Sequence, residues 1–153
     1  MILTTMCYLQ KENKTLMLHR IKKKKDVNKG KWIGVGGKLE AGESPLECIM
    51  REVKEETGYQ LHQAVCHGFV TFPGLLFGED EGMFIYTSQD FSGEMVECNE
   101  GVLEWIENNQ IQTLPMWEGD HYFFDWIKDD LFHIAKITYK EDKLVEFVDE
   151  TNK

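Results

Sequence analysis

The chain has 153 residues, of which 42% are hydrophobic and 12% aromatic, and it carries a formal net charge of −10 at pH 7. This length and composition predict one globular domain over residues 1–153, with no disulfide or metal needed for folding. The acidic balance disfavours a duplex DNA or RNA partner, because a phosphate backbone repels a negative protein.

The sequence also lacks the usual signs of membrane insertion or export. No apolar run approaches the ~20 residues that a membrane-spanning helix needs. The stretch MILTTMCYLQKENK has neither the basic region nor the cleavage site of a signal peptide. The four cysteines are scattered without metal-ligand spacing, which favours reduced thiols. We therefore expect a cytoplasmic protein without a membrane partner, either a monomer or a homodimer.

The predicted elements begin with a hairpin around the turn KENK. A lysine-rich stretch, RIKKKKDVNKGKW, follows, and it is either a solvated loop or a source of cations for a polyphosphate. Next comes KWIGVGGK, whose glycines allow backbone to approach a ligand closely. Strands are predicted over 2–10, 15–20, 63–72, 82–89, 101–107, 132–140 and 143–150, and a second helix over 118–128.

The first helix is predicted over Pro45–Thr57 from its end signals. Ser44 is suited to the N-cap, Glu47 completes a capping box with it, and Gly58 ends the helix. With the strands, this pattern predicts a mixed, mostly antiparallel sheet with two helices packed on it, which is an α+β fold rather than a doubly wound one.

Three glutamates of this helix raise an electrostatic problem. Glu52, Glu55 and Glu56 are spaced i, i+3 and i+4, so their carboxylates cluster on the helix surface. Like charges at this spacing destabilise a helix, and its C-terminal dipole disfavours anions further. Arg51 compensates only in part. Carboxylate oxygens beside a glycine-rich loop are typical ligands of Mg²⁺ or Mn²⁺ bound together with substrate phosphates.

The same stretch resembles the Nudix box, G-x5-E-x7-R-E-U-x-E-E-x-G-U, where U is a bulky aliphatic residue. The matching segment runs from Gly37 through Glu43 to Arg51 and on to Tyr59, the one departure, which is aromatic. The resemblance implies the Nudix fold, a mixed β-sheet sandwiched between helices as α/β/α. It also implies an Mg²⁺-dependent hydrolase, with Mn²⁺ as an alternative, that cuts a pyrophosphate linkage in a nucleoside diphosphate derivative.

The resemblance also implies roles for individual residues. The metal ligands would be the carboxylates of Glu52, Glu55 and Glu56 with the carbonyl oxygen of Gly37 or Gly36. Arg51 would orient these carboxylates, and Glu43 would brace the loop. The general base would be Glu52 or Glu100, which precedes the predicted strand containing Trp105; Glu100 is otherwise one more exposed acid.

The segment LPMWEGDHYFF resembles the base-holding segment of the MutT-like branch that hydrolyses oxidised purine triphosphates. The resemblance implies that Trp117 stacks on a purine and that Asp120 hydrogen bonds to its edge, although Trp117 could instead be a core residue. Two positions depart from the branch pattern, because Ile33 replaces an Asn and Gly119 replaces the first of two Asp.

Further candidates for substrate contact have weaker support. The full predicted substrate-binding set is Trp117, Asp120, Ile33, Phe72, Arg20 and Lys38. His121 could reach phosphate or base, or it could be structural, and Phe77 could line the mouth of a pocket.

The sequence therefore predicts a hydrolase that converts a (deoxy)nucleoside triphosphate, such as 8-oxo-dGTP, to the monophosphate and pyrophosphate. Two other functions stay open. One is hydrolysis of other nucleoside diphosphate derivatives, such as a nucleotide sugar or a capped RNA end. The other is a Nudix-fold module that binds a nucleotide without cutting it.

Overall fold

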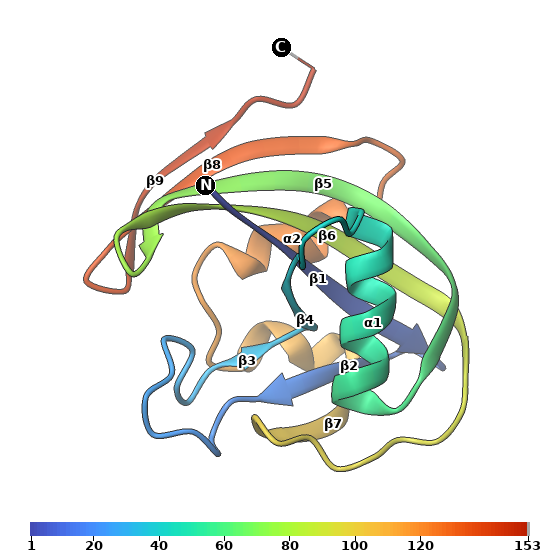
Figure 1. The fold of residues 1–153 in the computed structure, drawn as a ribbon. Coiled ribbons are helices and arrows are strands. Elements are labelled where there is room, and N and C mark those ends of the chain that lie inside the picture. The colour runs from blue at the N-terminus through green and yellow to red at the C-terminus, as the bar shows by residue number, and fades with distance from the viewer. Residues whose placement is uncertain (153) are drawn as a thin grey trace.

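The computed structural model describes residues 1–152, and its elements follow the predicted order (Figure 1). The elements are β1 (Ile2–Lys11), β2 (Lys14–His19), β3 (Trp32–Ile33), β4 (Val35–Lys38), α1 (Pro45–Thr57), β5 (Gln60–Leu76), β6 (Glu79–Ser92), β7 (Val102–Glu107), the 3-10 helix η1 (Asn108–Thr113), α2 (Asp120–Trp126), β8 (His133–Lys140) and β9 (Lys143–Asp149).

The strands form one mixed sheet with the order β3-β2-β1-β6-β5-β8-β9, while β4 pairs with β1 and β7 pairs with β2. Two of the pairings, β1 with β6 and β5 with β8, are parallel. The other described pairings are antiparallel. This is the mixed, mostly antiparallel sheet that the sequence predicts.

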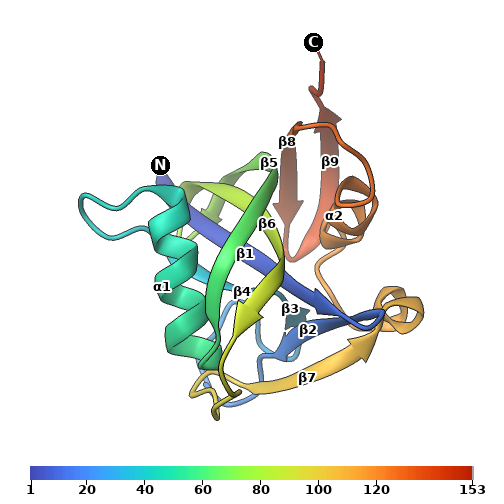
Figure 2. The same ribbon diagram turned by 90° about the vertical axis from the view of Figure 1, so that its right-hand side faces the viewer.

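The two α-helices cover opposite faces of this sheet. Figure 2 shows α1 on one side of β1, β5 and β6 and α2 on the other. Successive residues of β1 point to opposite faces because the side-chain period of a strand is two. Cys7 and Leu9 accordingly pack with the buried residues of α1, whereas Met6 and Tyr8 pack with those of α2. The α+β fold with an α/β/α sandwich is thus confirmed.

The hairpin of β5 and β6 is longer than predicted. The glycines and the proline between Phe72 and Met83 favour a loop in the sequence, but the antiparallel pairing continues to Leu76 and Glu79. An irregularity in the register between Phe72 and Leu76 accommodates Pro73 and Gly74. The predicted second helix is shorter than expected, since α2 spans only Asp120–Trp126.

Helix α1 has the ends that its sequence predicts. The Ser44 hydroxyl accepts a hydrogen bond from the Glu47 amide, and the Glu47 carboxylate accepts one from the Ser44 amide. At the C-terminus Gly58 has φ 84°, and its amide donates to the Lys54 carbonyl. These caps fix the rotation and the length of α1, and so they fix where its glutamates lie.

Candidate active site

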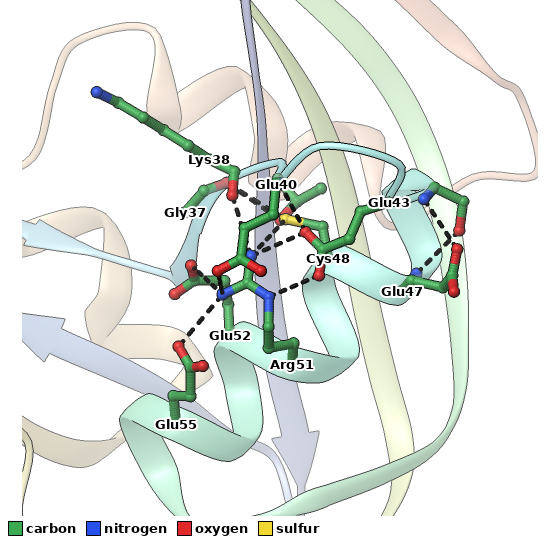
Figure 3. A network of polar contacts seen from close by, with 11 residues as sticks. Gly37, Lys38, Glu40, Glu43, Glu47, Cys48, Arg51, Glu52 and Glu55 are labelled. Atoms are coloured by element: carbon green, nitrogen blue, oxygen red, sulfur yellow. Dashed lines mark hydrogen bonds and ion pairs between the residues drawn. The ribbon is translucent and has the colours of Figure 1, made fainter.

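Arg51 of α1 is the centre of a polar network that links this helix to the loop before it (Figure 3). Its Nε and Nη2 donate to the two oxygens of Glu43, at 2.6 and 2.9 Å. Its Nη1 donates to Glu52 at 2.9 Å and to Glu55 at 3.2 Å. A guanidinium can satisfy several carboxylates at once because its donors form a rigid planar fork. Arg51 therefore holds the acidic side chains of α1 and of the preceding loop in fixed positions.

Glu43 connects this network to the loop before α1. Its Oε1 also accepts a hydrogen bond from the Glu40 amide at 2.8 Å. The hydrogen bonds from Arg51 and Glu40 lower the pKa of Glu43 to about 2. Glu43 therefore remains a carboxylate under all ordinary conditions, and its contacts are those of a residue that braces the loop.

Glu56 has a different environment, since its side chain is buried and lies under the glycine-rich strand β4. Its Oε2 accepts a hydrogen bond from the Gly36 amide at 2.9 Å. Burial, a hydrogen bond with Glu100 and the charges of Glu100 and Glu52 raise the pKa of Glu56 to about 10. The proton on Glu56 therefore replaces a positive charge that the site would otherwise require.

Glu100 reaches the same place from the loop before β7. Burial alone would raise its pKa, but its hydrogen bond with Glu56 and the cations Arg20 and Lys23 lower it. Arg20 Nη1 and Lys23 Nζ each lie 3.3 Å from a Glu100 oxygen. Glu56 and Glu100 thus form a carboxyl–carboxylate pair that holds one proton at neutral pH.

The glycines of β4 are required by the close approach of α1 and β1. A Cβ at Gly37 would lie 2.5 Å from the Glu52 carboxyl group, and one at Gly36 would lie 1.9 Å from the Thr5 carbonyl oxygen. The Gly37 carbonyl lies near the Thr5 hydroxyl and the Cys48 thiol, at 3.5 and 3.6 Å, both long contacts. The predicted ligands Glu52, Glu56 and Gly37 are therefore neighbours.

The donor set suits a divalent cation in its chemistry, since carboxylate and carbonyl oxygens are the ligands that Mg²⁺ prefers. Within residues 1–152, however, no three His, Cys, Asp or Glu side chains are gathered tightly enough to hold an ion. Glu55 is the outlying member, because its half-exposed carboxylate turns toward Arg51. Binding of a cation would require Glu56 to lose its proton and Glu52 or Glu55 to shift from Arg51.

A cavity of about 570 Å³ lies beside these residues. On what we term the glutamate side, its lining includes Gly37, Glu52 and Glu100. On what we term the aromatic side, it includes Phe72, Trp117 and Tyr139. The predicted substrate-binding residues Trp117, Asp120, Ile33, Phe72, Arg20 and Lys38 all line it. The sequence-predicted positions from both halves of the chain thus meet in one cavity.

Trp117 is buried in the wall of this cavity. Its Nε1 donates to the Asn28 side-chain oxygen at 2.7 Å, and the Lys31 ammonium lies 4.4 Å from the centre of an indole ring. Asn28 and Lys31 belong to the lysine-rich stretch, and no sequence pattern indicates that this stretch contacts Trp117. The loop between β2 and β3 is therefore attached to the aromatic side of the cavity.

Asp120, the first residue of α2, is 5% exposed. Within residues 1–152 its carboxyl group takes part in no hydrogen bond, and the residue lines the cavity. Burial and the charge of Glu81 raise the pKa of Asp120 to about 8, although Lys31 opposes the shift. Asp120 is thus a buried polar group that faces the cavity without a protein partner.

Tyr139 explains why a glycine precedes Asp120. A Cβ at Gly119 would lie 2.6 Å from the Tyr139 hydroxyl oxygen, so no larger residue fits there. That hydroxyl accepts a hydrogen bond from the Gly119 amide at 2.7 Å. The departure of Gly119 from the branch pattern is therefore matched by a tyrosine from β8, which sequence reasoning missed because β8 is distant along the chain.

Two other predicted positions have different outcomes. Phe77 lines the cavity with an almost fully exposed ring. His121 hydrogen bonds to Gln112 and is not part of the cavity lining. The structural interpretation of His121 is therefore the better one.

Comparison with known proteins places the chain in a family. Residues 2–127 match the model of the NUDIX domain. An uncharacterised Nudix hydrolase of Bacillus subtilis, YvcI, is 35% identical over 127 residues, which are 80% of this chain and 77% of that protein. The chain belongs to the Nudix family.

Two further comparisons confirm the resemblance to MutT-like Nudix hydrolases. The crystal structure of a MutT protein from Bacillus halodurans superimposes with a TM-score of 0.86 at 28% identity and covers 98% of both chains. An oxidized purine nucleoside triphosphate hydrolase of Danio rerio is 32% identical over 104 residues, which are 67% of this chain and 65% of that protein. Within residues 1–152, none of the helices is both long and apolar enough to span a membrane.

Proposed function

We propose that this Nudix hydrolase converts nucleoside triphosphates to monophosphate and pyrophosphate in a reaction that depends on Mg²⁺ or Mn²⁺, with oxidised purine nucleotides as substrates. The observation that carries the proposal is one cavity whose lining includes Glu52 of α1 and Glu100 as well as Trp117 and Asp120. The Danio rerio relative, an oxidized purine nucleoside triphosphate hydrolase, supports the same substrate class.

A divalent cation would be held by Glu52, Glu55 and Glu56 with the Gly37 or Gly36 carbonyl. When bound, such a cation neutralises phosphate charge and lowers the pKa of a coordinated water. Arg51 then keeps Glu43 and the glutamates in position. Glu52 or Glu100, both of which line the cavity, accepts the proton of the attacking water.

The substrate is oriented by groups on both sides of the cavity. Arg20 and Lys38 supply positive charge to the phosphates, and Trp117 offers an aromatic surface to the base. Stacking of a base on an aromatic side chain contributes roughly 1–3 kcal/mol. Asp120, buried and without a protein hydrogen bond, is available to the base edge.

The proposal is tested by product analysis on matched substrates. Pyrophosphate and monophosphate are measured with Mg²⁺ from 8-oxo-dGTP, dGTP, 2-oxo-dATP and dATP, with Glu56→Gln as the inactive control. We expect the oxidised members to have at least about tenfold higher kcat/KM, a difference of about 1.4 kcal/mol. Equal rates on all four would leave a general nucleotide pyrophosphatase. A nucleotide sugar and a capped RNA are assayed in parallel, and a sugar phosphate or a shortened RNA end from these, without product from the triphosphates, would indicate the other hydrolytic class. Binding without product from any substrate would indicate a sensor module.

A further inference from the structure

A second buried acid lines the aromatic side of the cavity. Glu81, near the start of β6, is 8% exposed and belongs to the cavity lining together with Asp120. The Thr4 hydroxyl of β1 donates a hydrogen bond to Glu81 Oε2 at 2.5 Å. The contact is possible because β1 and β6 are parallel neighbours. Thr4 lies opposite Met83, two residues from Glu81 and on the same face of the sheet. The hydrogen bond therefore fixes the Glu81 side chain.

Glu81 and Asp120 face the same space from different elements. Asp120 comes from α2 and its carboxyl group takes part in no hydrogen bond among the described residues, whereas Glu81 is held by Thr4. The negative charge of Glu81 helps to raise the pKa of Asp120. Buried carboxyl groups are costly unless they are partnered. The Thr4 hydroxyl occupies only one acceptor position of Glu81 and the Asp120 carboxyl has no partner, so the two together indicate a ligand that supplies hydrogen-bond partners.

We propose that Glu81 is a second base-reading residue of this cavity, which together with Asp120 selects guanine-type bases over adenine-type bases. The inference rests on the proposed function, because it assumes that the aromatic side of the cavity receives the base. It adds a residue on β6 to a recognition set that otherwise comes from the segment around Trp117.

The selectivity follows from the hydrogen-bonding groups of the bases. The Glu81 carboxylate only accepts hydrogen bonds, whereas Asp120, with its pKa raised to about 8, carries a proton at neutral pH and can also donate one. Guanine offers its ring N1–H and its exocyclic amine along one edge, and 8-oxoguanine adds an N7–H. Adenine offers only its exocyclic amine, and its ring nitrogens N1 and N7 are acceptors that a carboxylate repels. The Glu81 carboxylate in this cavity therefore favours guanine-type bases over adenine-type bases.

The test measures binding of nucleoside monophosphates without divalent metal, so that it does not depend on hydrolysis. Dissociation constants of 8-oxo-dGMP, dGMP and dAMP are determined by calorimetry for the wild type, Glu81→Gln and Glu79→Gln. Glu79 is the matched control, because it lies two residues away on β6 and is exposed outside the cavity lining. In Glu81→Gln the amide oxygen can still accept from Thr4, which leaves the NH₂ group to face the cavity in place of an acceptor.

We expect the wild type and Glu79→Gln to bind the two guanine nucleotides at least about tenfold more tightly than dAMP. Glu81→Gln should lose most of this preference, mainly through weaker binding of the guanine nucleotides. Thr4→Val, which removes the hydrogen bond to Glu81 but leaves the charge, should lose part of it and serves as the second variant if Glu81→Gln folds poorly.

Two outcomes overturn the inference. One is an unchanged guanine preference in both Glu81→Gln and Thr4→Val, and the other is a wild type that does not discriminate or does not bind the monophosphates. Failure of the proposed function has a different signature, since the wild type would then release no pyrophosphate from any triphosphate with Mg²⁺ or Mn²⁺.

Discussion

Glu56 keeps a proton at neutral pH because burial, Glu100 and Glu52 all oppose another negative charge at that position. Arg51, the cation of the neighbouring network, already forms ion pairs with Glu43, Glu52 and Glu55. The positive charge that the glutamate cluster lacks in the sequence is therefore supplied here by a proton. In the proposed function a divalent cation takes the place of that proton.

The stability of the metal-free protein should depend on the ionisation of Glu56. Its pKa is raised from 4.5 to about 10, so its favourable contribution is complete below pH 4.5 and is lost as the pH rises toward 10. Glu56→Gln cannot ionise and can still accept from the Gly36 amide. In thermal unfolding with a chelator, the free energy of unfolding of the variant should increase relative to that of the wild type by at least about 1 kcal/mol as the pH rises from about 5 to about 9. Parallel curves would contradict the assignment, and Glu47→Gln, on the exposed start of α1, is the control.

Arg51 should not be replaceable by lysine. A single ammonium cannot reproduce the paired hydrogen bonds to Glu43 together with those to Glu52 and Glu55. We expect Arg51→Lys to reduce the free energy of unfolding by about 1–3 kcal/mol in urea titrations and to lower kcat/KM more than about tenfold. Lys54→Gln, on the exposed face of the same helix, should change both by little. A fully active Arg51→Lys would show that the network does not position the glutamates.

At the scale of elements, substitutions at the two ends of α1 should differ in their cost to stability. Ser44→Ala removes one capping hydrogen bond and should cost about 1 kcal/mol. Gly58→Ala should cost more, at least about 2 kcal/mol, because φ is 84° and a Cβ would lie 2.5 Å from the Glu94 carbonyl oxygen. Urea unfolding of both variants gives the comparison. A smaller cost at Gly58 than at Ser44 would mean that the loop after β6 moves away freely.

The contact of α2 with β8 should show energetic coupling between Gly119 and Tyr139. Gly119→Ala places a Cβ 2.6 Å from the Tyr139 hydroxyl and should destabilise the protein. Tyr139→Phe removes that oxygen, so the double variant should be more stable than the sum of the single changes predicts, by about 0.5 kcal/mol or more. Additive effects in thermal unfolding would indicate that the remaining contacts with Ile137 dominate.

The elements also show what the sequence can and cannot predict. The ends of α1 and the spacing of its glutamates depend on residues within one helix, so sequence patterns predict them directly. Tyr139 and Glu81 reach the cavity from β8 and β6, which pair with strands distant in the sequence. Neither residue belongs to a sequence motif that would indicate its place in the cavity. The hairpin of β5 and β6 is longer than predicted for a related reason, since pairing between the strands overcomes the local preference of Pro73 and Gly74 for a loop.

At the scale of the whole molecule, the lysine-rich stretch does not form a free basic arm. Arg20, Lys22 and Lys23 pair with acids of the chain, and Asn28 holds Trp117. With a net charge of −10, the protein should not bind a fluorescent DNA duplex in anisotropy titrations at low salt. Binding that weakens steeply with added salt would contradict this expectation and would assign the remaining lysines to a nucleic-acid surface.

The most direct test of the active site is the position of a bound metal and nucleotide. Crystals grown with Mn²⁺ and a non-hydrolysable 8-oxo-dGTP analogue allow the metal to be located by anomalous scattering. We predict manganese among the carboxylates of Glu52 and Glu56 beside Gly37, with the base in the same cavity against Trp117. Manganese bound elsewhere, or a base outside the cavity, would contradict the account.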